Sequence, residues 1–234
     1  MKHSISLIIG SALLALPFMV QSVLAVGSNN RYDFTDFNKV SISSGMELSV
    51  TQSKSFDIQV NGSADDLKDL KVEKKGQTLR FYIEKKGWFH DHNISIKIGM
   101  PVLTELDLSG GSQATISLNQ PEESFACDLS GGSTIDGEIT CKQTEIGASG
   151  GSEVELSGQG GDLEVSGSGG SEFHLEKFQV RNVEADLSGG SELHIAMNGI
   201  LNVDASGGSE VTFSGKAEYG DTNMSGGSEI KKSR

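Results

Sequence analysis

Aromatic residues, proline, cysteine and positive charge are all scarce in this sequence. Aromatics make up 6% of the 234 residues, and the chain has 3 Pro and 2 Cys, with 19 Lys and Arg against 32 Asp and Glu. The formal charge of −13 argues against a nucleic-acid-binding protein, because phosphate binding depends on clustered Lys and Arg. It also weakens any case for docking on anionic lipid. The few aromatics are a poor supply for a large globular core.

A long apolar run occurs only at the N-terminus. Residues 1–25 contain Lys2 and His3, followed by an apolar stretch over residues 5–20. This order is typical of a cleavable secretory signal peptide. A membrane anchor is the alternative, but Pro17 interrupts a run that is already short for a ~30 Å hydrocarbon core. We therefore expect an exported chain, in the periplasm or at the cell surface, with no transmembrane segment after cleavage.

The two cysteines, Cys127 and Cys141, would enter an oxidising compartment. A disulfide between them would close a short loop and contribute about 3 kcal/mol in the chain-entropy account. Two buried free thiols are the alternative, since Cys behaves as a small hydrophobe. We favour the disulfide slightly over the free thiols.

Glycine, in contrast, is abundant, and it recurs in a fixed context. Of the 30 Gly residues, 14 lie in seven copies of Ser-Gly-Gly-Ser, spaced by 18 to 21 residues. A repeat at this spacing indicates a corner that recurs in the fold and not a flexible linker. The copies occupy residues 109–112, 130–133, 149–152, 168–171, 188–191, 206–209 and 225–228.

Apolar and polar residues alternate on both sides of each copy, which is the pattern of a strand with one buried face. Five positions after the first Ser the residues are Ala114, Ile135, Val154, Phe173, Leu193, Val211 and Ile230. We predict an all-β fold in which residues 106–234 form a right-handed, parallel β-helix-like solenoid of about seven repeats with Ser-Gly-Gly-Ser corners. Its thin core would need few aromatics. An antiparallel sandwich of hairpins is the alternative.

The N-terminal part of the mature chain, residues 26–105, differs in charge and pattern. Residues 26–100 carry 11 basic and 10 acidic residues, whereas residues 101–234 carry 7 and 22, so the acidity belongs to the repeats. Residues 40–50 look like a degenerate repeat, and residues 64–67 fit one helical turn. We expect an irregular β region that starts and caps the solenoid, with strands near residues 40–43, 47–51, 56–60, 70–73, 79–84 and 94–98.

Four segments together resemble a known bacterial family. The four segments are Phe37-Asn-Lys-Val-Ser-Ile, Gly45-Met-Glu-Leu-Ser-Val-Thr-Gln, Leu79-Arg-Phe-Tyr-Ile and Ile96-Lys-Ile-Gly-Met-Pro-Val-Leu-Thr-Glu-Leu. The last of them leads directly into the repeats. This order over residues 32–230 resembles the family described as putative auto-transporter adhesin, head GIN domain. The resemblance implies an exported, β-helical, adhesin-like protein of the Bacteroidetes type, and the family brings no catalytic residues to transfer.

Carboxylates recur in outward columns of the expected solenoid. Four positions after the first Ser, five repeats carry Glu, and coils stacked at ~4.8 Å would place these side chains one above another. Such a ladder is a candidate site for Ca²⁺, which prefers carboxylate oxygens. A solvated, solubilising face is the alternative that we favour. The residues are Glu153, Glu172, Glu192, Glu210 and Glu229.

Two histidines, His174 and His194, fall at equivalent positions beside this ladder. Two imidazoles with neighbouring carboxylates are a candidate site for a transition metal such as Zn²⁺. The interpretation that we favour is that the two histidines arose by sequence drift among the repeats and do not form a metal site.

The only aromatic cluster lies on an expected loop and is a candidate contact for a ligand or partner. A plug over the end of the core is the alternative that we favour slightly. The cluster consists of Trp88, Phe89, His90 and His92.

No Ser lies in a Gly-x-Ser-x-Gly elbow, and the Ser-Gly-Gly-Ser copies recur too regularly to be nucleophiles. We therefore predict a non-enzymatic exported module that binds a glycan or an envelope protein through its repetitive faces. A structural envelope protein without a ligand and a polysaccharide-active enzyme are the alternatives.

Overall fold

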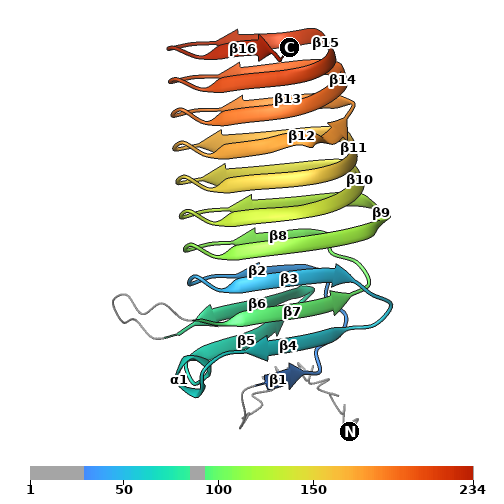
Figure 1. Cartoon of the computed structure of the whole chain (residues 1–234), viewed down its shortest axis with the longest axis vertical. Coiled ribbons are helices and arrows are strands. Elements are labelled where there is room, and N and C mark those ends of the chain that lie inside the picture. Colours follow the sequence, from blue (N-terminus) through green and yellow to red (C-terminus); the bar gives the residue numbers. More distant parts are fainter. Residues whose placement is uncertain (1–28, 85–92, 234) are drawn as a thin grey trace, which may run out of the picture.

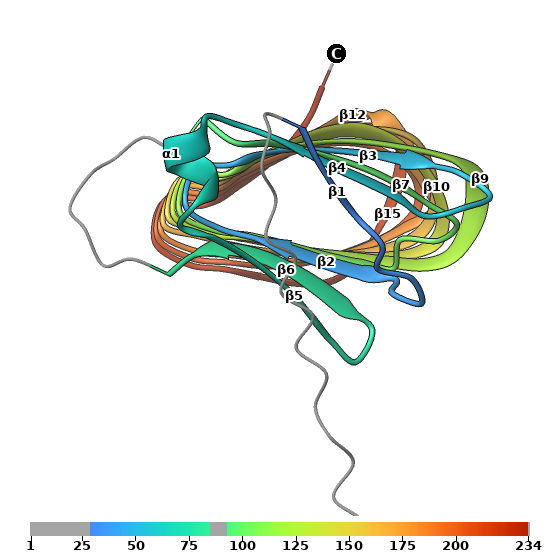
Figure 2. The same cartoon turned by 90° about the horizontal axis from the view of Figure 1, so that it is seen from below.

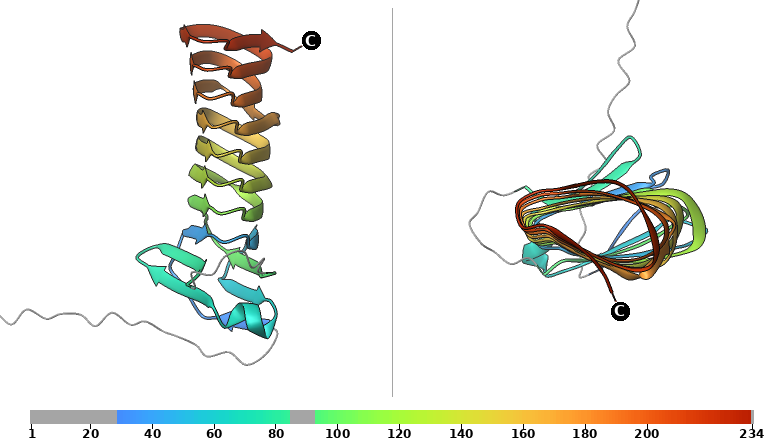
Figure 3. Two further views of the ribbon diagram at one scale, coloured as in Figure 1. Left: turned by 90° about the vertical axis from the view of Figure 1, so that its left-hand side faces the viewer. Right: turned by 90° about the horizontal axis from the view of Figure 1, so that it is seen from above.

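The computed structural model describes residues 29–84 and 93–233, and its strands stack into one column (Figure 1). The C-terminus lies at the end of the column opposite the N-terminal strands (Figure 3). This arrangement confirms the expected all-β solenoid. The strands of the repeat region pair in parallel, which consecutive hairpins cannot do, so the sandwich alternative is wrong.

Each coil of the repeat region is a long strand that bends around the column and ends at a Ser-Gly-Gly-Ser segment. In one coil the bend divides the strand in two. The strands are β8 (Glu105–Leu108), β9 (Gln113–Leu129), β10 (Thr134–Ser149), β11 (Glu153–Ser168), β12 (Glu172–Val180), β13 (Asn182–Leu187), β14 (Glu192–Ala205), β15 (Glu210–Met224) and β16 (Glu229–Lys232).

Equivalent residues of successive coils lie directly above one another and form two inward columns. One column follows the corners, and the other precedes them. Both columns are buried except in the last coil, so each coil buries its narrow inner face against its neighbours. The first column contains Ala114, Ile135, Val154, Phe173, Leu193, Val211 and Ile230; the second contains Leu106, Cys127, Ile146, Val165, Ala185, Val203 and Thr222.

The corners need glycine for both conformation and space. Gly131 and Gly132 have φ of 67° and 75°, in the left-handed region that side chains with a Cβ rarely adopt. A Cβ at Gly131 would also lie 3.2 Å from the backbone nitrogen of Gly110 in the coil below, whereas one at Gly132 would meet open space. Close stacking of the corners therefore depends most on the first glycine.

The last Ser of each corner points inward and is satisfied within its own turn. The Ser152 hydroxyl donates to the carbonyl of Ser149 at 2.8 Å and accepts from the backbone N–H of Ser133 at 3.2 Å. The same donation to the first Ser of the corner recurs in the other copies. A small hydroxyl can be buried here because its hydrogen bond is built into the corner.

The N-terminal region starts the column out of chain order. Strands β2 (Lys39–Ile42) and β3 (Glu47–Gln52) form a coil directly below β8 and β9, and Ser44 and Gly45 between them have positive φ. Strands β6 (Thr78–Ile83) and β7 (Ser95–Met100) pair in parallel with β2 and β3 from below. Along the chain, the coil formed by β2 and β3 therefore comes before the coil formed by β6 and β7, although it lies above it in the column. The chain then continues into β8, above both.

Antiparallel strands close this end of the column (Figure 2). Strand β4 (Asp57–Asn61) pairs with β7, β1 (Asn29–Tyr32) pairs with β4, and β5 (Leu70–Lys75) pairs with β6. The helical turn α1 (Ala64–Leu67) begins at Ser63, whose side chain accepts from the N–H of Asp66. Such a cap protects an edge that would otherwise be open to pairing.

Among the described residues, none of the helical structure has the length and hydrophobicity that a membrane span needs.

Candidate functional site

The structure stacks the five glutamates of the sequence pattern into one outward column, which we call the glutamate ladder. Adjacent members are paired in the parallel register of β11, β12, β14, β15 and β16. The column continues downward with uncharged Thr134 and Gln113. The ladder consists of Glu153, Glu172, Glu192, Glu210 and Glu229.

One lysine lies between two carboxylates of the glutamate ladder, and another pairs with an acid of the neighbouring column. The Lys231 ammonium lies 2.9 Å from a carboxylate oxygen of Glu210 and 3.1 Å from one of Glu229. Its hydrogen bond lowers the pKa of the Glu210 carboxyl. In the neighbouring column, Lys177 lies 2.9 Å from Glu155 and lowers the pKa of that carboxyl in the same way. Part of the charge on this face is therefore balanced by the protein itself.

His174 and His194 are stacked beside the ladder, with ring centroids 5.7 Å apart and planes 6° from parallel. Their Nε2 atoms lie 3.4 Å from Glu172 and 3.7 Å from Glu192 respectively. The sequence thus correctly placed the two rings together. Within residues 29–84 and 93–233, however, no group of three or more His, Cys, Asp or Glu side chains is arranged to hold a metal ion.

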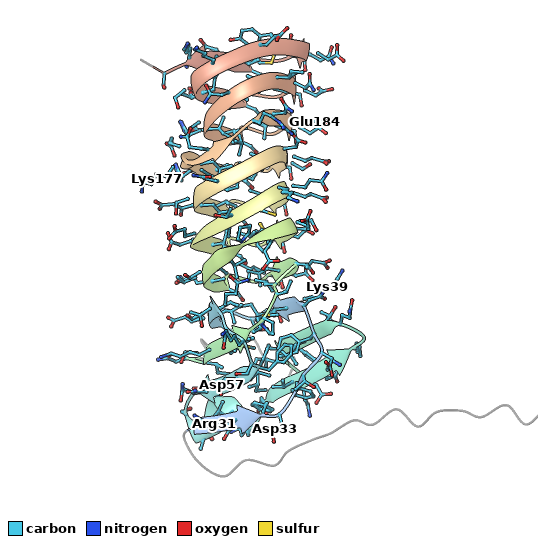
Figure 4. All side chains as sticks on the ribbon, turned by 90° about the vertical axis from the view of Figure 1, so that its right-hand side faces the viewer. Arg31, Asp33, Lys39, Asp57, Lys177 and Glu184 are labelled. Carbon is cyan, nitrogen blue, oxygen red and sulfur yellow. The ribbon has the colours of Figure 1, made fainter. Side chains whose placement is uncertain are left out.

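A hollow of about 610 Å³ lies over strands β8, β9, β10, β11, β13 and β14, on the half of each coil that precedes the corner, and Lys39 of β2 lines its N-terminal end. We call it the acidic groove. In Figure 4, Glu184 and Lys39, which both line it, project from one side of the column, whereas Lys177 near the glutamate ladder projects from the opposite side. The central residues of the acidic groove are Gln143, Asp162, Asn182, Glu145, Glu164 and Glu184.

Two columns of side chains run along the acidic groove at the coil spacing. Glu145, Glu164 and Glu184 are stacked in register, and Asn202 follows them in the next coil. Beside them, Gln143, Asp162 and Asn182 form a second column. A ligand in the acidic groove would therefore meet the same type of side chain in several successive coils.

The protein satisfies only part of this polar surface. Asp162 accepts hydrogen bonds from Arg181 at 2.9 Å and from Asn182 at 2.8 Å, and both bonds lower the pKa of its carboxyl. Lys39 pairs with Glu105 at the N-terminal end of the groove. In the described part of the chain, no hydrogen bond or ion pair engages the exposed side chains of the stacked Glu145, Glu164 and Glu184. These three carboxylates are free to accept hydrogen bonds from a ligand.

Asp107 and Asp128 are stacked in another outward column on the same half of the coils. Asp107 is half-buried, and burial together with the charges of Glu105 and Asp128 raises the pKa of its carboxyl. These two residues line a second hollow of about 540 Å³ next to the corners.

The two cysteines are free and buried, so the expected disulfide is not formed. Cys141 lies directly above Glu122, five residues before Cys127 on the same strand. Five residues of extended strand span roughly 16 Å, too far for a disulfide, which needs Cα atoms within about 7 Å. Burial raises the pKa of both thiols, and Cys141 donates to the carbonyl of Gln143. Both cysteines act as core residues.

The remaining expectations fall on residues that the structure does not describe. The loop residues Trp88, Phe89, His90 and His92 lie outside the described residues, as does the expected signal peptide over residues 1–25. Glu145, Glu164 and Glu184 recur four positions before successive corners in the sequence, but the sequence does not reveal that this face is concave. A polar residue six positions before the corner, at Gln143, Asp162 and Asn182, is the signal that could have pointed to the groove.

Sequence and structure comparisons identify relatives of the chain. The family described as "Putative auto-transporter adhesin, head GIN domain" matches residues 36–217. No protein with a curated description matches the sequence.

Solved structures share the fold. A "putative adhesin" from Bacteroides fragilis is similar with a TM-score of 0.78 and 20% identity, over 87% of this chain and 95% of that one. A "putative lipid binding protein" from Parabacteroides distasonis has a TM-score of 0.67 and 18% identity, over 88% and 96%. A "putative adhesin" from Parabacteroides merdae has a TM-score of 0.67 and 16% identity, over 88% and 96%. At these identities the likeness establishes the fold alone.

Proposed function

The chain belongs to the putative auto-transporter adhesin, head GIN domain family, and we propose that it is an exported, non-enzymatic module that binds a neutral glycan chain in the acidic groove. The observation that carries this proposal is a concave surface on which carboxylate and amide side chains repeat from coil to coil.

The repeat spacing suits a polymer. The groove crosses seven stacked strands, from β2 through β8, β9, β10, β11 and β13 to β14, so it extends over six steps of ~4.8 Å, or about 29 Å. A polymer lying along the column can make one set of contacts in each coil, and linked weak contacts add up to useful affinity.

The side-chain chemistry suits hydroxyl groups. Carboxylates such as Glu164 accept hydrogen bonds, whereas the amides of Gln143 and Asn182 both donate and accept. A neutral sugar offers hydroxyls that do both. Anionic polymers would meet like charge along the whole groove and are repelled.

The chemistry disfavours a lipid tail in this groove. One structurally similar protein carries the description of a lipid-binding protein. Sites for apolar ligands are lined mainly by apolar and aromatic side chains, whereas carboxylates and amides line this groove. We therefore assign the acidic groove to a sugar chain and the location to the cell envelope, in line with the adhesin-like family and the expected signal peptide.

Titration of the purified chain with soluble neutral polysaccharides, such as a mannan and a β-glucan, tests this function by calorimetry. We expect binding to at least one of them, about tenfold weaker in Glu164→Ala because a charged hydrogen-bond acceptor worth about 1.5–3 kcal/mol is lost. The matched control is Glu172→Ala in the glutamate ladder, which should bind as the wild type does. Binding should persist in EDTA, since the groove side chains contact the ligand directly.

Other outcomes would support the alternatives. Binding that falls steeply with salt, and that occurs only with basic proteins, would indicate an envelope-protein partner instead. Turnover of a polysaccharide, lost in a Glu→Gln variant of one coil, would indicate an enzyme. Absence of any binding by a folded chain would leave a structural role and contradict the proposal.

A further inference from the structure

The last coil exposes side chains at positions that every earlier coil buries. Tyr219 and Met224 lie directly above Leu201 and Ala205. Leu201 and Ala205 are 0% and 1% exposed, whereas Tyr219 and Met224 are 56% and 38% exposed. In the described chain, no strand lies above β16 or above the part of β15 that follows Phe213 (Figure 1). Tyr219 and Met224 thus occupy positions that belong to the core in the other coils, but no further coil of the described chain covers them.

The backbone at this end is also unpaired on one side. Within the described chain, β16 pairs only with β15, and the N–H groups of Glu229 and Ser233 point toward it. Because N–H groups along a strand alternate in direction, those of Ile230 and Lys232 point to the open edge. An edge of this kind is a template for another strand.

We propose that the open edge pairs with the same edge of a second copy of this chain, so that two columns join end to end across a two-fold axis at Ile230. The two β16 strands run antiparallel, as a two-fold axis across the edge requires. Ile230 of each copy donates its outward N–H to the carbonyl of Ile230 in the other, which forms a hydrogen-bonded antiparallel pair.

The side chains select this register. With Ile230 opposite Ile230, each Glu229 lies opposite the Lys231 of the other copy, so two opposite-charge pairs form across the join. Sliding one copy by two residues would place Lys231 opposite Lys231. Only the first register combines paired backbone, apolar contact at the centre and complementary charge on either side.

The charge of the last coil permits the approach of two acidic chains. Residues 210–233 carry 3 basic and 4 acidic residues, whereas residues 106–209 carry 3 and 17. The opposite end of the column is closed by the antiparallel strands β1, β4 and β5, so the assembly stops at two copies. This contact does not depend on what the acidic groove binds.

Sedimentation equilibrium of the purified chain at increasing concentration tests the proposal. We expect a monomer–dimer equilibrium that Ile230→Pro weakens at least tenfold, since it removes the outward N–H while the N–H groups that bond β15 remain. The matched control, Ile230→Val, should dimerise as the wild type does. A monomer at all concentrations, or a dimer that Ile230→Pro leaves unchanged, would overturn the proposal.

A charge exchange tests the register separately from folding. Lys231→Glu should weaken the dimer, and adding Glu229→Lys should restore it, because the exchanged residues again face opposite charges. Circular dichroism checks that each variant is folded. Ile230→Cys should cross-link two copies on oxidation, since the Cα atoms of such a pair lie about 5.5 Å apart. Failure of both the rescue and the cross-link in a folded dimer would contradict this register.

Discussion

The two outward faces of the same coils carry similar numbers of carboxylates but differ in what surrounds them. Beside the glutamate ladder lie His174, Lys177 and Lys231, which pair with its acids or with their neighbours. In the acidic groove, the stacked Glu145, Glu164 and Glu184 line a hollow. A row of acids in a repeat is therefore not enough to propose a binding face. The proposal for the acidic groove depends on concavity together with carboxylates that the protein leaves free.

The largest expected effects come from the core beneath the two faces. Phe125 and Phe173 are 1% and 0% exposed, and Phe125 also lines the acidic groove. Each Phe→Ala change should lower the free energy of unfolding by about 3–5 kcal/mol, measured by urea denaturation. Under conditions where both variants are folded, Phe125→Ala should also weaken glycan binding and Phe173→Ala should not. Equal effects on binding would remove the distinction between the faces.

The corners join the two faces, so loosening one should destabilise both. Ser152→Ala removes a buried hydroxyl that bonds both Ser149 and Ser133, and we expect a loss of about 1–3 kcal/mol in the free energy of unfolding. The control is Ser228→Ala in the last corner, where the exposed side chain should contribute less than about 0.5 kcal/mol. Similar losses in the two variants would show that burial of the corner hydroxyl is unimportant.

Protonation should distinguish Asp107 from a typical surface acid. Its pKa is raised in the folded chain, so the folded state binds the proton more tightly, and stability falls as the pH rises through the interval between the ordinary and the raised pKa. Asp107→Asn should therefore stabilise the chain at pH 7 by less than about 1 kcal/mol, because the group is half-exposed. Thermal unfolding against pH should show the gain vanish below the ordinary carboxyl pKa. A destabilised variant at pH 7 would contradict this.

Glu210 in the glutamate ladder should show the opposite sign. Its pKa is lowered by Lys231, so its contribution to stability is present above the ordinary carboxyl pKa and is lost as the pH falls through the lowered value. Glu210→Gln should cost a few tenths of a kcal/mol at pH 7 and nothing in strong acid, since the pair is exposed. Unfolding curves for the Asp107 and Glu210 variants that shift in the same direction would refute the contrast between the faces.

Local signals in the sequence were enough to predict the repeat region. The glycine corners mark where each strand starts, and alternation identifies which side chains point inward, so the column from Ala114 to Ile230 was predicted correctly. The helical turn at residues 64–67 and the six strands expected between residues 40 and 98 also match the structure to within two residues, whereas strand β1 was not predicted.

Long-range features could not be predicted. The placement of β6 and β7 beneath β2 and β3 depends on pairing between segments that are distant in the sequence, and no local sequence pattern predicts this pairing. The hollow over Asp162 and Asn182 depends on where each coil bends, which alternation does not specify. Likewise, the separation of Cys127 from Cys141 follows from the register of neighbouring coils and not from their spacing in the chain.

The most direct test is a map of the residues that respond to a bound sugar chain. Amide chemical shifts of the ¹⁵N-labelled chain would be recorded with and without the neutral polysaccharide that binds best. We predict shift changes clustered at residues 143–145, 162–164 and 182–184, with none at residues 153–155, 172–174 and 192–194. Changes centred on the second group, or spread evenly over both faces, would contradict the assignment of binding to the acidic groove.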